Sequence, residues 1–467
     1  MKRILLSVFA VAITAAWALP TTATASEVTL GGQYRLRGEQ RNNADFNDSV
    51  NDHTDFWGQR VRLTANAKAT DDTSVKITLQ DTRNWGTVNT VANTGVAGSL
   101  TDTGNTLDLH ESYVNLDKLF GAPVSLRAGR QELSYGDERL VGSLGWSNNG
   151  RSFDALKLVA TTELVNVDLF TAKTNDTNVT AKDQDFHGLY VTVKAVPNNT
   201  VDLYVLSLRD NAGAAALVTN NTTNATITGT GGFSKTQVLN TYGLRVKGGL
   251  MGIDYTAEFA NQTGSMQTEK LATSTTTRYK IGARAYAIKG GYTLTAPVKI
   301  RVGAEYDYAS GDKDSTDNKI GTFSNLFPTH HAHLGYMDMQ NWRNVKALSL
   351  NVKADVTSEL SLYAAYWNFK LAQKKDAWYT GGANNATQTG TLRAANANNT
   401  NSDIGSEYDL VANYKYNSAV NVELGYGQFK AGKFAKDNIN GIAATGTTSA
   451  GKSGNSTWTY LQLTANF

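Results

Sequence analysis

The feature that most constrains this chain is an alternation of apolar and polar residues that recurs along almost its whole length. In 298–308, Val298, Ile300, Val302, Ala304, Tyr306 and Tyr308 share one face, whereas Lys299, Arg301, Gly303, Glu305 and Asp307 share the other. Successive side chains of a β-strand point to opposite sides, so the pattern predicts strands with one apolar and one polar face. It recurs in 59–69, 348–356, 407–416 and 461–467.

This pattern predicts eighteen strands, at 27–41, 54–70, 73–84, 105–118, 122–131, 152–161, 163–174, 184–196, 200–211, 237–249, 251–262, 278–295, 298–310, 342–356, 360–373, 404–417, 420–433 and 455–467. The connections between them alternate between short turns, such as 71–72 and 296–297, and long loops, such as 132–151 and 311–341. An even number of strands with this rhythm is typical of a transmembrane barrel with short periplasmic turns and long outer loops. We therefore predict an all-β, up-and-down antiparallel β-barrel over 26–467, with both termini in the periplasm.

The bilayer explains why such a sheet must close. Its core offers no water to unpaired backbone N–H and C=O groups, so an open sheet edge is not tolerated there. A mean hydropathy as low as −0.35 is compatible with a membrane barrel, because outward apolar residues alternate with inward polar ones along each strand. The outward positions end in Phe467 and include tyrosines expected to lie at the membrane interfaces, namely Tyr306, Tyr308, Tyr366, Tyr414 and Tyr416.

The first residues predict export. Lys2 and Arg3 precede an apolar run over 4–19, and Ala23-Thr24-Ala25 provides a small-residue cleavage site. The run is shorter than the roughly 20 apolar residues that a spanning helix needs. We therefore predict a signal peptide over 1–25 and a mature protein in the outer membrane. The chain has no cysteine, which excludes disulfides and thiolate metal sites.

The polar face carries the residues that we predict to line the pore. They are Arg35, Arg37, Arg60, Arg62, Arg127, Lys157, Arg245, Arg284, Arg301, Glu305, Glu407 and Asp409. Rings of Arg and Lys select anions, and the planar guanidinium fork binds carboxylates through two hydrogen bonds. The alternative is that these charges pair across neighbouring strands and only keep the lumen polar.

Two connecting segments have unusual composition. The segment 129–155 concentrates Arg130, Arg139, Arg151 and Asp154 around one outer loop, and we predict that these four residues also line the pore. We expect the loop to fold into the barrel mouth and narrow it; the alternative is an ordinary solvated loop. The segment 327–338 contains three histidines, of which His330 is the first. No helical spacing of histidine and carboxylate accompanies them, so we predict neither a metal site nor any other cofactor.

These segments carry a resemblance to a known family. Gly129-Arg-Gln leading to Tyr135-Gly, the strand Arg151-Ser-Phe-Asp-Ala, the loop Phe327-Pro-Thr-His with Gly335 and Asp338, and Gly405-Ser-Glu-Tyr-Asp-Leu resemble the alginate export family of outer-membrane proteins. The resemblance implies an 18-stranded barrel whose electropositive pore passes a uronic-acid polysaccharide. Carried over by position, it marks Arg130, Arg139, Arg151, Asp154, His330, Asp338, Glu407 and Asp409. Asn- and Thr-rich stretches at 211–232 and 381–400 depart from the family pattern.

We therefore predict a passive channel for polar, anionic solutes, either an alginate-like polysaccharide or small anions. Its expected partners are outer-membrane lipid, lipopolysaccharide and the solute, with no nucleic acid; a periplasmic export partner stays open. A barrel that houses a partner protein or serves adhesion is one alternative. An outer-membrane hydrolase is another, although the chain has no G-x-S-x-G, P-loop or H-E-x-x-H motif, so we predict no enzyme activity.

Overall fold

The structure is a computed structural model that describes residues 27–49, 51–86, 106–175, 183–210, 237–270, 275–295, 297–314, 316–380, 391–393, 399–439 and 453–467. The predicted signal peptide, 1–25, and most of the Asn- and Thr-rich stretches lie outside the described residues. None of the helices in the described ranges is long and apolar enough to cross a membrane.

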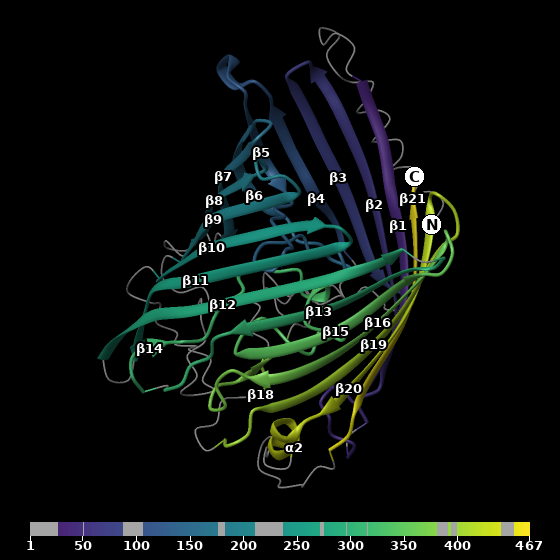
Figure 1. Ribbon diagram of the computed structural model, residues 1–467. Coiled ribbons are helices and arrows are strands. Elements are labelled where there is room, and N and C mark those ends of the chain that lie inside the picture. Colours follow the sequence, from purple (N-terminus) through teal and green to yellow (C-terminus); the bar gives the residue numbers. More distant parts are fainter. Residues whose placement is uncertain are drawn as a thin grey trace.

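Eighteen long antiparallel strands form one closed sheet, as predicted (Figure 1). They are β1 (Glu27–Asn42), β2 (Thr54–Thr70), β3 (Thr73–Asn84), β4 (Thr106–Leu116), β5 (Val124–Gln131), β6 (Phe153–Thr161), β7 (Val165–Asn175), β8 (Gln184–Val193), β9 (Asn199–Asp210), β10 (Gln237–Leu250), β11 (Ile253–Lys270), β12 (Thr275–Thr295), β13 (Lys299–Ala309), β15 (Val345–Asp355), β16 (Leu360–Leu371), β19 (Asp403–Lys415), β20 (Val420–Ala431) and β21 (Ser456–Asn466). Each pairs with its neighbour in sequence, and β1 pairs with β21 from Gln33–Asn466 to Asn42–Thr457, which closes the barrel. The clearest difference from the prediction is β11, which continues to Lys270 instead of ending at 262.

The connections differ at the two ends of the barrel, again as predicted. At one end the chain reverses within a few residues: Met251 and Gly252 both adopt positive φ between β10 and β11, as a two-residue hairpin requires. The long connections at the other end contain the short elements β14 (Lys319–Ile320), η2 (His330–Ala332), β17 (Trp378–Tyr379), β18 (Thr391–Arg393) and α2 (Lys433–Ile439). The 3-10 turn η1 (Leu119–Gly121) lies in the connection between β4 and β5.

The two faces of the wall differ as the alternation requires. On β15, Leu348 and Leu350 are 48% and 57% exposed, whereas Ser349 between them is fully buried. A large apolar side chain exposed on the outside of a barrel faces lipid, and the buried polar residue faces the interior. The same arrangement places Leu461, Leu463 and Phe467 on the outer face.

The interior contains a hydrophobic core made largely by two long connections. Leu133 and Val141 from the connection after β5, and Phe323, Met337 and Trp342 from the connection after β13, are at most 3% exposed. In Figure 1 the connection after β13 runs inside the strand wall. The barrel is thus filled by its own loops, and the position and contacts of these loops decide what can pass.

Candidate functional site

Residues 132–152, between β5 and β6, form what we call the first inward loop. Arg35 on β1 donates to the carbonyl oxygens of Gly145 and Ser147, both at 2.9 Å. Arg60, directly opposite Arg35 on β2, donates to the same two oxygens at 3.1 and 2.9 Å. Both guanidinium groups are buried, so each contact replaces hydration that the arginine has lost. The two arginines therefore fix the Gly145–Ser147 part of the loop to β1 and β2.

Arg37 extends this attachment. Its guanidinium lies 4.0 Å from the centre of the Trp146 ring and donates to the Trp146 carbonyl at 2.7 Å. The remaining charge is compensated by Glu39, whose Oε1 accepts from Nε of Arg37 at 2.6 Å. The fully buried Arg37 thus holds an aromatic side chain of the loop by both its ring and its backbone.

On the opposite wall the same loop is held by ion pairs. Arg139 contacts Glu305 and lies 2.8 Å from Asp307, both on β13. Asp137 accepts from Arg245 on β10 and lies 2.6 Å from Nζ of Lys289 on β12. Because β1 and β2 are many strands away from β10–β13, the first inward loop spans the lumen from one side to the other.

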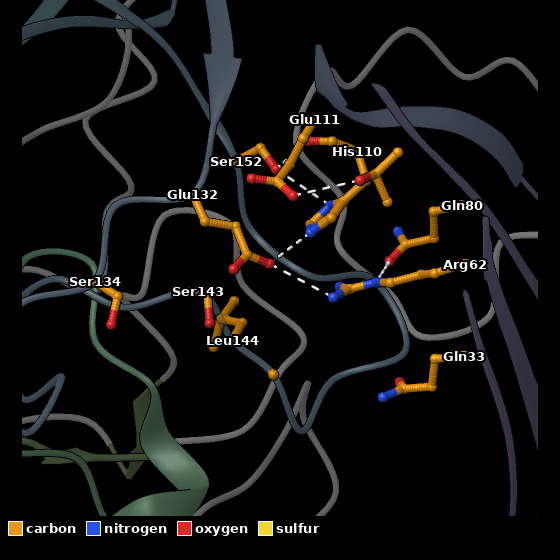
Figure 2. A network of polar contacts seen from close by, with 12 residues as sticks. Gln33, Arg62, Gln80, His110, Glu111, Glu132, Ser134, Ser143, Leu144 and Ser152 are labelled. Carbon is orange, nitrogen blue, oxygen red and sulfur yellow. Dashed lines mark hydrogen bonds and ion pairs between the residues drawn. The ribbon is translucent and has the colours of Figure 1, made fainter. Parts of the chain in front are cut away.

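The start of this loop is fixed by a polar network (Figure 2). Glu132 accepts from Nε2 of His110 at 2.7 Å and lies 3.5 Å from Arg62, which also donates to Gln80 at 2.8 Å. Ser152, at the other end of the loop, lies 3.2 Å from Nδ1 of His110. Serine, histidine and glutamate occur together in hydrolases, but here the Ser152 hydroxyl donates to the backbone oxygen of His110. The proton is therefore not directed to the imidazole, and this arrangement ties the loop ends to β4.

The second inward loop, residues 310–344 between β13 and β15, packs against the first. Val141 and Phe327 form an isolated parallel bridge, with Gly142 N–H donating to Phe327 O at 2.8 Å. Arg151 donates to Phe327 O at 2.5 Å, Pro328 O at 3.0 Å and Gly142 O at 3.1 Å. One half-buried arginine thus satisfies carbonyl groups from both loops and joins them into a single unit.

The second loop reaches the wall through backbone N–H groups. Met337 N–H donates to Oε1 of Glu407 at 2.8 Å, and Tyr336 N–H approaches Asp409 at 3.4 Å. Gly335 has φ +92°, and a Cβ added there would overlap the Glu407 carboxylate. Glu407 and Asp409 are buried neighbours on one face of β19, so the loop needs a glycine to approach them.

His331 links the two loops by stacking. Its ring lies 3.7 Å from that of Trp146, nearly parallel, and its Nδ1 is 3.2 Å from Oδ2 of Asp338. His330 lines a cavity of about 10 Å³ between the loops, with Arg139 and Trp342. A cavity of this size holds about one water molecule, so the interface is closely packed.

The structure places most of the predicted pore residues on the inner face but gives them a different task. Arg35, Arg37, Arg60, Arg62, Arg245, Glu305, Glu407 and Asp409 contact the inward loops, and Arg139 and Arg151 belong to the first loop. Arg127, Lys157 and Arg301 lie on the inner wall without an ion pair or hydrogen bond to either loop in the described part of the chain. The sequence analysis did not predict that Asp137, Trp146 and Lys289 would attach the first inward loop to the wall. Of these, only Asp137 had a signal in the sequence, namely the charge density of 129–155.

Three positions were predicted wrongly. Arg130 and Asp154 are register partners and form an ion pair at 3.3 Å, and Asp154 shares its face of β6 with Leu156, which is 54% exposed. Arg284 is exposed on β12, whereas the adjacent Ala283 and Ala285 are buried. All three therefore lie on the outer face. The rule that apolar residues face lipid fails here because the inner positions pack against the apolar inward loops.

An open cavity of about 380 Å³ remains beside the first inward loop. Ser134, Tyr135 and Gly136 of the loop form one side of it. The wall contributes Asn166, Asp168, Tyr190, Thr192, Thr200, Asp202, Arg245 and Lys247. Rings of Tyr135 and Tyr190 are stacked with centroids 4.6 Å apart. The arrangement combines aromatic surface with several hydrogen-bonding groups and fits a small polar solute.

Two histidines of the second inward loop are desolvated. Burial lowers the pKa of His330 from 6.5 to about 4. Burial, together with Arg139 and Lys289, lowers the pKa of His333 well below 6.5. Nε2 of His333 lies 2.6 Å from the Asp137 carbonyl oxygen, which a neutral imidazole with a proton on Nε2 satisfies. Both rings are therefore neutral when the loops are packed at neutral pH.

Acidification is expected to loosen the inward loops. Below the unfolded-state pKa of 6.5, a solvated His330 or His333 binds a proton that the packed form does not, so packing weakens as pH falls. The loss is up to about 1.4 kcal/mol per pH unit for each histidine. Single-channel conductance in planar bilayers should rise between about pH 7 and about pH 4.5, and His330→Gln with His333→Gln should flatten that rise. A double variant that keeps the wild-type pH profile would contradict this assignment.

The fold and the loop-narrowed lumen define an outer-membrane channel of the porin class. Residues 26–452 match the family model described as alginate export, so the chain belongs to the alginate export family. No curated protein matches the sequence. Similar solved structures include Pseudomonas aeruginosa OccK9 (OpdG), at 11% identity and TM-score 0.56, covering 94% of this chain and 98% of that one. OccD3 (OpdP) of the same organism is 12% identical with a TM-score of 0.54, and the match covers 96% of this chain and 92% of that one. Pseudomonas aeruginosa OpdK, solved with vanillate, is 10% identical with a TM-score of 0.53, and the match covers 94% of this chain and 98% of that one. At such identities the likeness shows the barrel fold alone.

Proposed function

We propose that this channel passes small anionic solutes passively, with the long connections outside the cell and both termini in the periplasm. The observation that carries the proposal is an excess of positive charge beside the open cavity. Lys157 pairs with Asp168 at 3.2 Å, and Arg245 pairs with Asp202 at 2.7 Å and also with Asp137. Asp137 in turn lies 2.6 Å from Nζ of Lys289. Lys247 has no ion pair among the described residues.

Arg127 adds to this excess. It lies opposite Lys157 on the neighbouring strand, and its guanidinium contacts the Tyr113 ring at 4.5 Å without an ion pair in the described ranges. Basic groups along a narrow wall favour anions by electrostatics, and arginine binds carboxylates especially well. OpdK, which shares the fold, was solved with vanillate, a carboxylate.

Family membership supports a second candidate, the export of a uronic-acid polymer. The packed loops leave a cavity suited to a small solute, so a polymer requires the inward loops to move. Conductance measured with and without added oligouronate separates the two candidates. A lower conductance in the presence of oligouronate supports a path for uronates, and an unchanged conductance supports small anions alone.

Two other functions fit the interior less well. A barrel that houses a partner chain needs free lumen, whereas here the two inward loops fill it with a hydrophobic core. Hydrolysis needs an activated nucleophile, whereas the Ser152 hydroxyl donates to a backbone carbonyl. We therefore propose transport without catalysis.

Charge reversal beside the cavity is expected to invert the selectivity. The variant is Arg127→Glu with Lys247→Glu. A unit charge about 8 Å from a passing ion changes the energy of that ion by roughly 0.5 kcal/mol in water, and by more inside the barrel. The reversal potential in a KCl gradient should therefore shift from anion to cation preference, with a permeability ratio changed roughly tenfold. Lys346→Glu with Lys370→Glu makes the same charge change on the outer face and should leave the ratio unchanged. An unshifted ratio in the inner variant would refute anion selection by these residues.

A further inference from the structure

A row of basic residues lies on the outer face of the wall near the end that bears the long connections. Arg284 on β12, Lys346 on β15, Lys370 on β16 and Lys430 on β20 are all exposed. We call these four residues the basic arc. None of them forms an ion pair with a carboxylate in the part of the chain that the structure describes. The strands that carry them lie along one side of the barrel in Figure 1.

The basic arc borders the surface that faces lipid. On β15 the outward positions that follow Lys346 are Leu348, Leu350 and Val352, which are 38–57% exposed. A line of tyrosines lies beside the arc: Tyr286 stacks on Tyr308 at 5.0 Å, and Tyr366 lies 5.1 Å from Tyr408. Tyrosines mark the interface between the bilayer and water, so the basic groups lie at headgroup level.

The basic arc contains two lysines that face each other on neighbouring strands. Lys346 is the direct register partner of Lys370, which places two ammonium groups side by side on one face. Like charges directly opposite one another on neighbouring strands are destabilising. Lys430 lies over the Tyr408 ring at 4.8 Å, which gives it an aromatic contact but no counter-charge.

The opposite side of the barrel shows that this excess is local. There three outward basic residues are paired: Arg83 with Asp81 at 2.5 Å, Arg130 with Asp154 at 3.3 Å, and Lys173 with Asp183 at 2.7 Å. A fourth, Arg209 on β9, is the register partner of an acid, Asp185 on β8. The long connections next to the arc contain acids, but Asp317 and Asp437 pair with Lys319 and Lys433 and not with the arc. In the sequence, 381–402 contains no Asp or Glu, and 438–455 contains none either.

We propose that the basic arc binds the phosphate groups of a phosphorylated glycolipid, the lipid A part of lipopolysaccharide, in the outer leaflet. This rests on the orientation in the proposed function, with the long connections outside the cell. Compact ammonium groups suit phosphate oxygens, and each basic residue near an anionic lipid surface strengthens binding by roughly fivefold. The lipid supplies the counter-charge that the wall lacks at these four positions. It binds the outer face and does not enter the lumen.

The test is native mass spectrometry of the full barrel in detergent with diphosphorylated lipid A. Wild type should retain the lipid, and Lys346→Gln with Lys370→Gln and Lys430→Gln should weaken retention at least tenfold. The matched control is Arg83→Gln with Lys173→Gln, two outward basic residues that already have partners, and it should change retention less than twofold. Heat-modified mobility on gels confirms that all variants are folded.

Further arms identify the ligand. Dephosphorylated lipid A should bind wild type at least tenfold more weakly, and inorganic phosphate should not displace the lipid. Equal retention of both forms of lipid A, equal loss in the control variant, displacement by phosphate alone, or equally strong binding of phosphatidylglycerol would each overturn the proposal. Ion selectivity is measured separately, so failure here leaves the proposed channel function intact, and failure of anion selectivity leaves this binding result intact.

Discussion

Replacing Arg139 by methionine is expected to open the channel. The side chain is 2% exposed, and its partners Glu305 and Asp307 are 13% and 0% exposed. Methionine fills a similar volume but leaves two carboxylates without their cation. Breaking a buried ion pair in this way costs about 3–5 kcal/mol, which shifts the ratio of packed to released loop by roughly a hundred- to several-thousandfold. Single-channel conductance should increase severalfold.

Two further variants test the cause of that increase. Adding Glu305→Gln and Asp307→Asn to Arg139→Met removes the uncompensated charges and should return much of the closed state. Arg301→Met breaks a half-exposed pair with Asp254, at 2.6 Å, that touches neither inward loop, and should leave conductance near the wild-type value. If Arg139→Met conducts like wild type, the first inward loop does not limit the pore.

Replacing Gly335 by alanine is expected to release the second inward loop from the wall. The added Cβ would meet the carboxylate of Glu407, which is fully buried and cannot move aside, and φ is +92° at this position. Strained backbone and overpacking together cost roughly 2–5 kcal/mol. The N–H groups of Tyr336 and Met337 would then lose their carboxylate acceptors. Conductance should rise, and 310–344 should become sensitive to protease in the folded barrel.

Gly282→Ala is the matched control for this change. Gly282 lies on β12 with nothing within 4 Å of an added Cβ, and it does not need positive φ. This variant should keep wild-type conductance and protease resistance. Equal sensitivity in both variants would mean that the loss comes from general instability of the barrel, and would contradict the close approach of the second loop to Glu407.

The strands could be predicted because each one is determined locally. The alternation in 298–308 requires only that one face meet lipid and the other a polar interior, and the structure confirms it in β13. The rhythm of connections determined the direction of every strand and the closure of the sheet. The inward folding of 132–152 was also anticipated, from the density of charge between Arg130 and Arg151.

The site was less predictable, because the same residue types can serve a pore or a loop anchor. Arg35 and Arg60 were predicted to meet solute, yet they donate to carbonyl oxygens of the first inward loop. Arg284 and Asp154 were assigned to the wrong face, since Ala283 and Phe153 beside them are apolar on the inside. Both errors have one source: the interior near the long connections is a hydrophobic core, so polarity no longer marks the lumen.

The sequence by itself determined the strand number, the closed sheet, the export signal that it predicts and the family resemblance. These follow from short-range patterns imposed by the bilayer, which acts on every strand alike. Only the tertiary structure decided where the pore is narrowed and which charges stay free. Contacts such as Arg139 with Asp307 and Arg151 with Phe327 join residues 168 and 176 positions apart. Alternation within a strand contains no information about such pairs, because they depend on how two loops pack inside the finished barrel.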